Sequence, residues 1–146
     1  MKLIPYLMFF DGRCREAFEF YAAALGGEIV ALTTYGDMPA APDQPALPAE
    51  ARAQIANVQL LAAGASLMGG DSIMGCTGSE RVDGRNDTTV NIEVDTIEEA
   101  ERLFAALSAG GKVQMPLTET FWSQRFGMFE DRYGKPWMIN CNKPMP

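Results

Sequence analysis

The chain has 146 residues, of which 47% are hydrophobic, and a formal net charge of -7 at pH 7. This length suits one domain, or two small and closely packed halves, with a real core. The negative charge argues against nucleic acid or an anionic membrane as the main partner, and the absence of histidine excludes an ordinary histidine-liganded metalloenzyme.

The first half of the chain predicts a strand, a helix and a strand, followed by a long loop and a hairpin. Residues 5–10 are aromatic-rich and run into a turn dipeptide, which favours a strand. Residues 15–25 place apolar side chains on one helical face and precede two glycines, which favours a helix that ends there. Residues 28–35 are apolar and β-branched, and residues 36–52 hold four prolines, which predicts a long loop of the kind that often forms a lid. The hairpin follows at residues 56–68.

The second half repeats this order of elements. Residues 1–70 form the predicted first module, residues 71–87 a linker rich in Gly, Ser and Asp, and residues 88–146 the second module. The two helices align, with Tyr21 matching Phe104. The strand, helix, strand and hairpin of the second module are predicted at residues 89–94, 99–109, 112–117 and 127–140. The chain therefore predicts two βαβββ modules of the α+β class.

One segment of the second module is the strongest candidate for a ligand site. It interleaves aromatic and polar side chains, namely Glu119, Phe121, Trp122, Arg125 and Phe126. Aromatic surface with a few orienting polar groups suits the wall of a pocket. The whole segment is predicted to lie between two strands. The alternative interpretation is core packing, with Trp122 and Phe126 filling the gap between the two halves and Arg125 paired with an acidic neighbour, and the sequence leaves both open.

Few other residues suggest chemistry. Asp71 joins Arg125 as a possible polar anchor for a ligand, whereas Asp131, followed by Tyr133 and Gly134, favours hairpin-turn chemistry over catalysis. Without histidine there is no Ser-His or Cys-His pair, so the catalytic residues stay unassigned.

Three cysteines give no disulfide framework. The odd count favours free thiols in a reducing cytoplasm. Cys14 lies near the start of a helix, where a thiol is either reactive or part of the packing. Cys76 lies in the linker, and Cys141 follows the last strand.

Several motifs resemble a known family. They are FDGRCREA at residues 10–17, LMGGD at 67–71, TFW at 120–122 and WMIN at 137–140. These motifs resemble the PhnB-like branch, labelled 3-demethylubiquinone-9 3-methyltransferase-like, of the vicinal-oxygen-chelate superfamily. That superfamily includes glyoxalase I, extradiol dioxygenases and bleomycin-resistance proteins, and the resemblance covers nearly the whole chain. The sequence lacks the glycine-rich strand-to-helix loop with which Rossmann-like enzymes bind S-adenosylmethionine, which argues against the methyltransferase label.

The resemblance implies that the curved mixed sheets of the two modules surround a cleft, with the helices on their outer faces. In the first strand of the second module, Val90, Ile92 and Val94 would face the helix, leaving the alternate residues toward the cleft. The expected ligand-binding residues are Phe9, Asp71, Asn91, Glu93, Glu119, Trp122, Arg125 and Phe126.

The resemblance also implies where a metal would bind. Metal-dependent members carry four ligands, usually His and Glu, at positions that correspond here to Pro5, Ile55, Thr89 and Met138, each within about one residue. A divalent ion needs imidazole, thiolate or carboxylate donors, and none of these four residues supplies one. The adjacent residues Tyr6, Gln54 and Thr88 offer only neutral oxygen or nitrogen atoms. We therefore expect neither a metal nor a cofactor.

The leading hypothesis is a metal-free small-molecule-binding protein of the glyoxalase/bleomycin-resistance type, with an apolar or aromatic ligand in the inter-module cleft. One alternative is a lyase, isomerase or dioxygenase of the same superfamily that uses Glu93 or Glu119, and another is a non-catalytic assembly module. The resemblance implies a homodimer, whereas neither nucleic acid nor a membrane is an expected partner.

Overall fold

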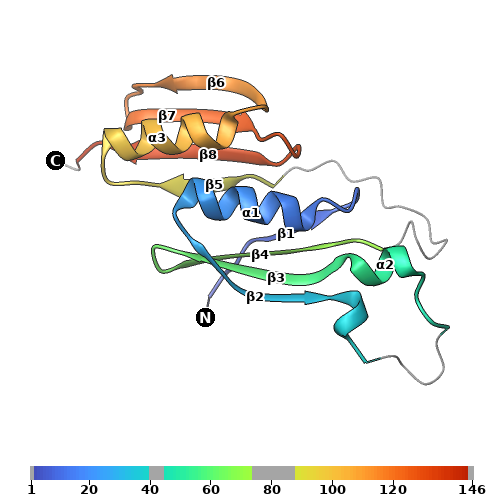
Figure 1. Ribbon diagram of the computed structural model, residues 1–146. Helices are drawn as coiled ribbons and strands as arrows, with labels where there is room; N and C mark the ends of the chain where they lie inside the picture. The colour runs from blue at the N-terminus through green and yellow to red at the C-terminus, as the bar shows by residue number, and fades with distance from the viewer. Residues whose placement is uncertain (1, 40–44, 74–87, 145–146) are drawn as a thin grey trace. The chain divides into compact units, whose positions relative to one another are not determined.

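The computed structural model describes residues 2–39, 45–73 and 88–144 (Figure 1). Most of the predicted linker, together with Cys76, lies outside the described residues. The chain divides into two compact units, Met1–Asp83 and Gly84–Pro146, which we describe separately.

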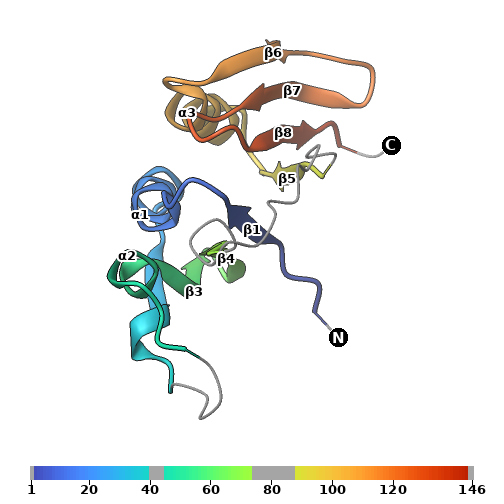
Figure 2. The ribbon, with the colours of Figure 1, turned by 90° about the vertical axis from the view of Figure 1, so that its right-hand side faces the viewer.

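The first unit is a four-stranded mixed sheet with one long helix on one face (Figures 1 and 2). Its strands are in the order β1-β4-β3-β2, and only the β1–β4 pair is parallel. Its elements are β1 (Tyr6–Phe9), α1 (Cys14–Leu25), β2 (Glu28–Thr34), the 3-10 helix η1 (Tyr35–Asp37), α2 (Ala49–Ala53), β3 (Ile55–Ala62) and β4 (Ala65–Asp71).

The core of the first unit lies between α1 and the sheet. Phe18 contacts Phe9 and Tyr21 edge to face, with ring centroids 6.3 and 5.4 Å apart, and all three side chains are buried. The Phe18 ring lies so close to Gly69 of β4 that a Cβ added there would be 2.6 Å from it. The helix can approach the sheet this closely because Gly69 has no side chain.

The predicted loop at residues 36–52 was only partly correct, because it contains one short helix and overlaps another. Residues 40–44 lie outside the described part of the chain, but η1 begins at Tyr35 and α2 forms at Ala49–Ala53. The sequence AEARA consists of strong helix formers, and Pro48 occupies the N-cap position, where its missing N–H costs no hydrogen bond.

The second unit has the same architecture. Its strands are in the order β5-β8-β7-β6, with β5 and β8 parallel, and α3 lies against one face of the sheet (Figures 1 and 2). Its elements are β5 (Val90–Glu93), α3 (Ile97–Ser108), β6 (Lys112–Thr118), β7 (Ser123–Glu130) and β8 (Pro136–Asn142). The prediction of two βαβββ modules of the α+β class is confirmed.

The second core repeats the pattern of the first with different residues. Phe104 of α3 lies over Gly127 and contacts Phe129 edge to face, with ring centroids 5.1 Å apart. Trp137 of β8 is fully buried nearby in the same core. The helix begins after Thr96, whose Oγ1 accepts a hydrogen bond from the backbone N–H of Glu99, the third helical residue, at 3.2 Å. Among the described residues, no helix is long and apolar enough to cross a bilayer.

Candidate functional site

The sheet of the second unit has one face that α3 does not cover, which we call the helix-free face. Paired residues on neighbouring strands point to the same side of a sheet, so the register identifies this face. The row of Ile92, Ile139 and Gly127 lies beneath Phe104 and therefore faces α3. The alternate residues form the helix-free face, namely Asn91, Glu93, Met115, Thr118, Phe126, Met128, Met138 and Asn140.

Methionines form the middle of this face. The register aligns Met115, Met128 and Met138 across three adjacent strands, and each of them is half-buried. Methionine is flexible and polarisable, so a row of three offers an apolar surface that adapts to different ligand shapes.

Asn140 is the buried polar residue of the face. It lies on the central strand β8, paired with Glu93 on one side and Phe126 on the other. The residue is 8% exposed, and its Nδ2 donates to Asn142 Oδ1 at 2.6 Å. Among the described residues, none donates a hydrogen bond to Asn140 Oδ1. A buried acceptor in this state is unusual, because desolvation without a partner is costly.

Three aromatic rings continue from this face to the surface. Phe126 contacts Trp122 with ring centroids 5.4 Å apart, and Trp122 contacts Phe121 at 4.7 Å, both edge to face. The exposed fraction of the side chain is 42% for Trp122 and 88% for Phe121. We call these three residues the aromatic cluster. Large exposed aromatic side chains are a common feature of binding surfaces.

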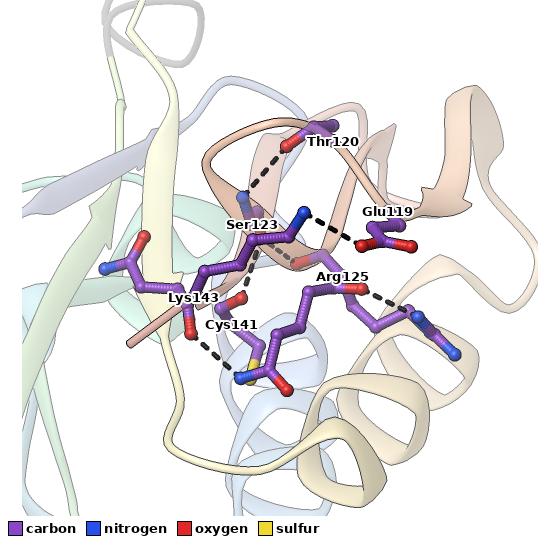
Figure 3. Close-up of polar contacts among 8 residues, drawn as sticks. Glu119, Thr120, Ser123, Arg125, Cys141 and Lys143 are labelled. Atoms are coloured by element: carbon purple, nitrogen blue, oxygen red, sulfur yellow. Dashed lines mark hydrogen bonds and ion pairs between the residues drawn. The ribbon is translucent and has the colours of Figure 1, made fainter. Parts of the chain in front are cut away.

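Hydrogen bonds to Ser123 fix the backbone beneath the aromatic cluster (Figure 3). Ser123 is fully buried, and its Oγ lies 2.6 and 2.8 Å from the carbonyl oxygens of Arg125 and Cys141, which share its one hydroxyl proton. Its backbone N–H donates to Thr120 Oγ1 at 3.0 Å. Ser123 already belongs to β7, so the prediction that the whole candidate segment lies between two strands was wrong. The strand begins there because Ser123 satisfies backbone groups of both β7 and β8.

The charged residues of the segment form ion pairs, of which Figure 3 shows the one between Lys143 and Glu119. Lys143 Nζ lies 2.8 Å from Glu119 Oε1, and this hydrogen bond and charge lower the pKa of Glu119. Arg125 Nε lies 3.7 Å from Glu101 Oε1, and its Nη1 donates to the carbonyl oxygen of Gln124 at 2.7 Å. Glu119 therefore favours the ionised form, which makes it a poor proton donor near neutral pH.

Two predicted site residues belong to the first unit and make contacts within its fold. Phe9 packs in the core against Phe18. Asp71 is 1% exposed, and its two carboxylate oxygens accept backbone N–H bonds from Cys14 at 3.0 Å and Ile55 at 2.9 Å. A role for either residue in ligand binding stays a prediction, as does the cleft between the modules.

The remaining predicted residues belong to the second unit. The structure places Asn91, Glu93 and Phe126 on the helix-free face and Trp122 in the aromatic cluster, whereas Glu119 and Arg125 form the ion pairs described above. Asn140 was not among the site residues predicted from the sequence. Alternation along β8 could have found it, because it lies two residues beyond Met138.

Asp131 acts in the β7–β8 turn, as predicted. Its Oδ1 accepts the backbone N–H bonds of Tyr133 at 2.8 Å and Lys135 at 3.0 Å, and its Oδ2 accepts from Trp137 Nε1 at 2.8 Å. This buried carboxylate therefore joins the turn to the core.

The residues at the superfamily's metal positions do not suit a metal ion. Ile55 is buried in the core of the first unit, Met138 presents a thioether, and Pro5 and Thr89 supply no charged donor. Within the described ranges, no group of three or more His, Cys, Asp or Glu side chains could hold a metal ion. We therefore derive no chemistry from a metal at these positions.

Comparisons with known proteins agree with this fold. Residues 3–139 match the Glyoxalase/Bleomycin resistance protein/Dioxygenase superfamily. The chain is 32% identical to protein YjdN of Escherichia coli (strain K12), over 100% of this chain and 99% of that protein.

Two solved structures are also similar. Protein PA1353 from Pseudomonas aeruginosa is 40% identical, with a TM-score of 0.83 and 99% of each chain covered. A putative 3-demethylubiquinone-9 3-methyltransferase, the PhnB protein from Bacillus cereus, shares the fold at 23% identity, with a TM-score of 0.72 and coverage of 97% of this chain and 99% of that one. The chain therefore belongs to the glyoxalase/bleomycin resistance protein/dioxygenase superfamily.

Proposed function

We propose that this protein binds a small apolar or aromatic molecule, without a metal ion, on the helix-free face of the second sheet. The observation that carries this proposal is the composition of that face. Its three aligned methionines and the adjoining aromatic cluster supply apolar contact area, and Asn140 supplies a buried polar group. Mostly apolar surface with a few fixed polar groups is the usual composition of a small-molecule site.

The metal-free part of the proposal is supported by the donor chemistry. The chain has no histidine, and apolar or neutral side chains occupy the superfamily's metal positions. The alternative, an enzyme that works through Glu93 or Glu119, gains no support from Glu119, because Lys143 holds its carboxylate in an ion pair.

We further propose that the protein is a cytoplasmic homodimer whose ligand lies in the cleft that the superfamily forms between modules. Support comes from the resemblance and from the odd number of cysteines, of which Cys14 and Cys141 are buried thiols. Light scattering in solution tests the dimer directly: a monomer at all concentrations would refute it.

Metal analysis tests the first half of the proposal. Protein purified without chelator is expected to contain no stoichiometric metal, and its melting temperature is expected to stay constant across a series of divalent ions. A tightly bound metal at one per chain that raises the melting temperature would instead favour the enzyme.

Ligand screening tests the second half. Apolar and aromatic fragments are expected to shift the amide resonances of β7 and β8, and Trp122→Ala is expected to weaken binding about tenfold, because it removes an aromatic contact. Val113→Ala is the matched control, since Val113 is 50% exposed on β6 and lies outside the helix-free face. If no fragment binds and the protein still assembles with copies of itself, the assembly module is the better interpretation.

A further inference from the structure

The acceptor atom Asn140 Oδ1 has a consequence for the kind of ligand that fits. Asn140 lies on an inner strand of the second sheet and is more than nine-tenths buried, as is its Oδ1 atom, and its Nδ2 is already bonded to Asn142. No donor among the described residues reaches Oδ1. A group that satisfies this atom must therefore donate a hydrogen bond, as an N–H or an O–H does.

The neighbour of Asn140 on the same face is a second acceptor. Glu93 of β5 is directly paired with Asn140, and its side chain is exposed. The only other acidic side chain that the register places on this side of the sheet, Glu130, is paired with Lys112 at the far end of β7. A carboxylate beside a buried amide oxygen favours a donor that also carries positive charge.

In the first unit, a side chain of the protein covers the position that corresponds to Asn140. When the two units are matched by the rows of residues that face their helices, Leu7 corresponds to Ile92 and Gly69 corresponds to Ile139. Gly70 therefore corresponds to Asn140. The Tyr6 hydroxyl lies 2.6 Å from where a Cβ of Gly70 would be.

That tyrosine has its own acceptor. The Tyr6 hydroxyl donates to the carbonyl oxygen of Ala56 at 3.1 Å, across the space above Gly70. In the second unit the residue that corresponds to Tyr6 is Asn91, which is shorter and exposed. A side chain of the protein thus occupies this space in the first unit, whereas the second unit presents an acceptor there.

We propose that the ligand of the second sheet carries a protonated amine, which donates to Asn140 Oδ1 and pairs with Glu93 while its apolar part lies on the methionines and the aromatic cluster. This inference rests on the proposed function and specifies its ligand class: apolar or aromatic amines.

Matched pairs of probes test the ligand class. Phenethylamine and tryptamine are titrated into isotope-labelled protein beside hydrocinnamate and indole-3-propionate, which have the same rings and chain lengths but end in a carboxylate. Each amine is expected to bind about tenfold more tightly than its matched acid, because a charged donor gains two acceptors that would repel a carboxylate. The resonances expected to shift are the side-chain amide of Asn140 and the backbone amides of β5 and β8.

Three variants separate this site from the overall negative charge. Asn140→Leu removes the acceptor without changing charge, and Glu93→Gln removes the charge from an exposed residue that the fold does not need. Each is expected to weaken amine binding about three- to tenfold and to leave the acids unaffected or slightly improved. Glu98→Gln, on α3, removes the same charge from a residue outside the helix-free face and is expected to change nothing.

The possible outcomes distinguish a wrong ligand class from a wrong binding function. The amine assignment is wrong, while the binding function stands, if the acids shift the same resonances and bind as tightly as the amines. The same conclusion follows if Asn140→Leu and Glu93→Gln both leave amine affinity unchanged. If neither amines nor acids bind anywhere on β5, β7 or β8, both proposals fail. A preference for amines that Glu98→Gln reduces as much as Glu93→Gln would reflect net charge alone and would also overturn the assignment.

Discussion

The two units share a fold but fasten the end of their last strand in different ways. In the first unit, Asp71 is the last residue of β4. Its carboxylate accepts hydrogen bonds from the backbone N–H groups of Cys14, the first residue of α1, and Ile55, the first residue of β3. The corresponding residue of the second unit is Cys141, whose carbonyl oxygen accepts from the Ser123 hydroxyl at 2.8 Å. A repeated fold can therefore keep its topology while the polar contacts that fix it are exchanged.

A second difference lies on the face of each sheet that its long helix does not cover. Tyr6 covers Gly70 in the first unit and bonds to a neighbouring carbonyl, whereas Asn140 in the second unit has an acceptor with no donor among the described residues. A polar group that serves the fold has its partners inside it. One that serves a ligand is left without them, at a cost in stability. This contrast predicts that mutating such a polar group costs more stability in the first unit than in the second.

The largest effect is expected at Asp71. Asp71→Ala leaves the buried N–H groups of Cys14 and Ile55 without acceptors and should lower the free energy of unfolding by about 3 kcal/mol or more. Asn140→Leu should change it by less than about 1 kcal/mol, because the acceptor that it removes has no protein donor and the Nδ2 bond that it breaks leads to the exposed Asn142. Urea denaturation measures both. Equal losses at the two sites would show that the contrast between structural and ligand-directed polar groups is false.

An intermediate effect is expected where Tyr6 covers Gly70. A methyl group at Gly70 would meet the Tyr6 hydroxyl at 2.6 Å and the carbonyl oxygen of Ala56 at 2.9 Å, so Gly70→Ala should cost about 1–3 kcal/mol. Adding Tyr6→Phe should recover part of that cost, since it removes one of the two clashing atoms. Denaturation of the two single variants and the double variant gives the coupling between them. Strict additivity would mean that Tyr6 does not occupy this space in solution.

The fold was predictable because its signals are local and occur twice. Hydrophobic alternation, two amphipathic helices and paired glycines identify each βαβββ module without knowledge of long-range contacts. The errors came where neighbouring residues indicate different local structures. The prolines of residues 36–52 concealed the helix former AEARA, and the aromatic residues of residues 119–126 concealed the start of β7 at Ser123.

The site was less predictable, for a physical reason. Asp71 and Arg125 carry charge, which makes them look like anchors in a sequence, but the structure gives both of them partners within the chain. Asn140 carries no charge, and its importance depends on which donors reach it. Alternation along β8 could place Asn140 on the same face as Met138, but the donors around it depend on the register between β5, β8 and β7, which no local pattern encodes.

The smallest effect is expected at the loop before β7, where the units again differ. The first unit places the helix α2 before β3, whereas the second has a short loop whose Glu119 pairs with Lys143, the residue that follows β8. The ion pair lowers the pKa of Glu119, so whatever stability it contributes is present above the ordinary pKa of glutamate and is lost as pH falls through the lowered value. Lys143→Met should raise the pKa of Glu119 toward the ordinary value, as followed by NMR titration of its carboxyl carbon.

The matched control for this prediction is Arg102→Met, which removes the cation that lowers the pKa of Glu99 and should leave Glu119 unchanged. Both glutamates are exposed, so solvent screens their ion pairs and the melting temperature should hardly move. A pKa of Glu119 that does not respond to Lys143→Met would show that Lys143 does not hold this loop. Glu119 would then be free to meet a ligand, and the acceptors on the second unit would extend beyond Asn140 and Glu93.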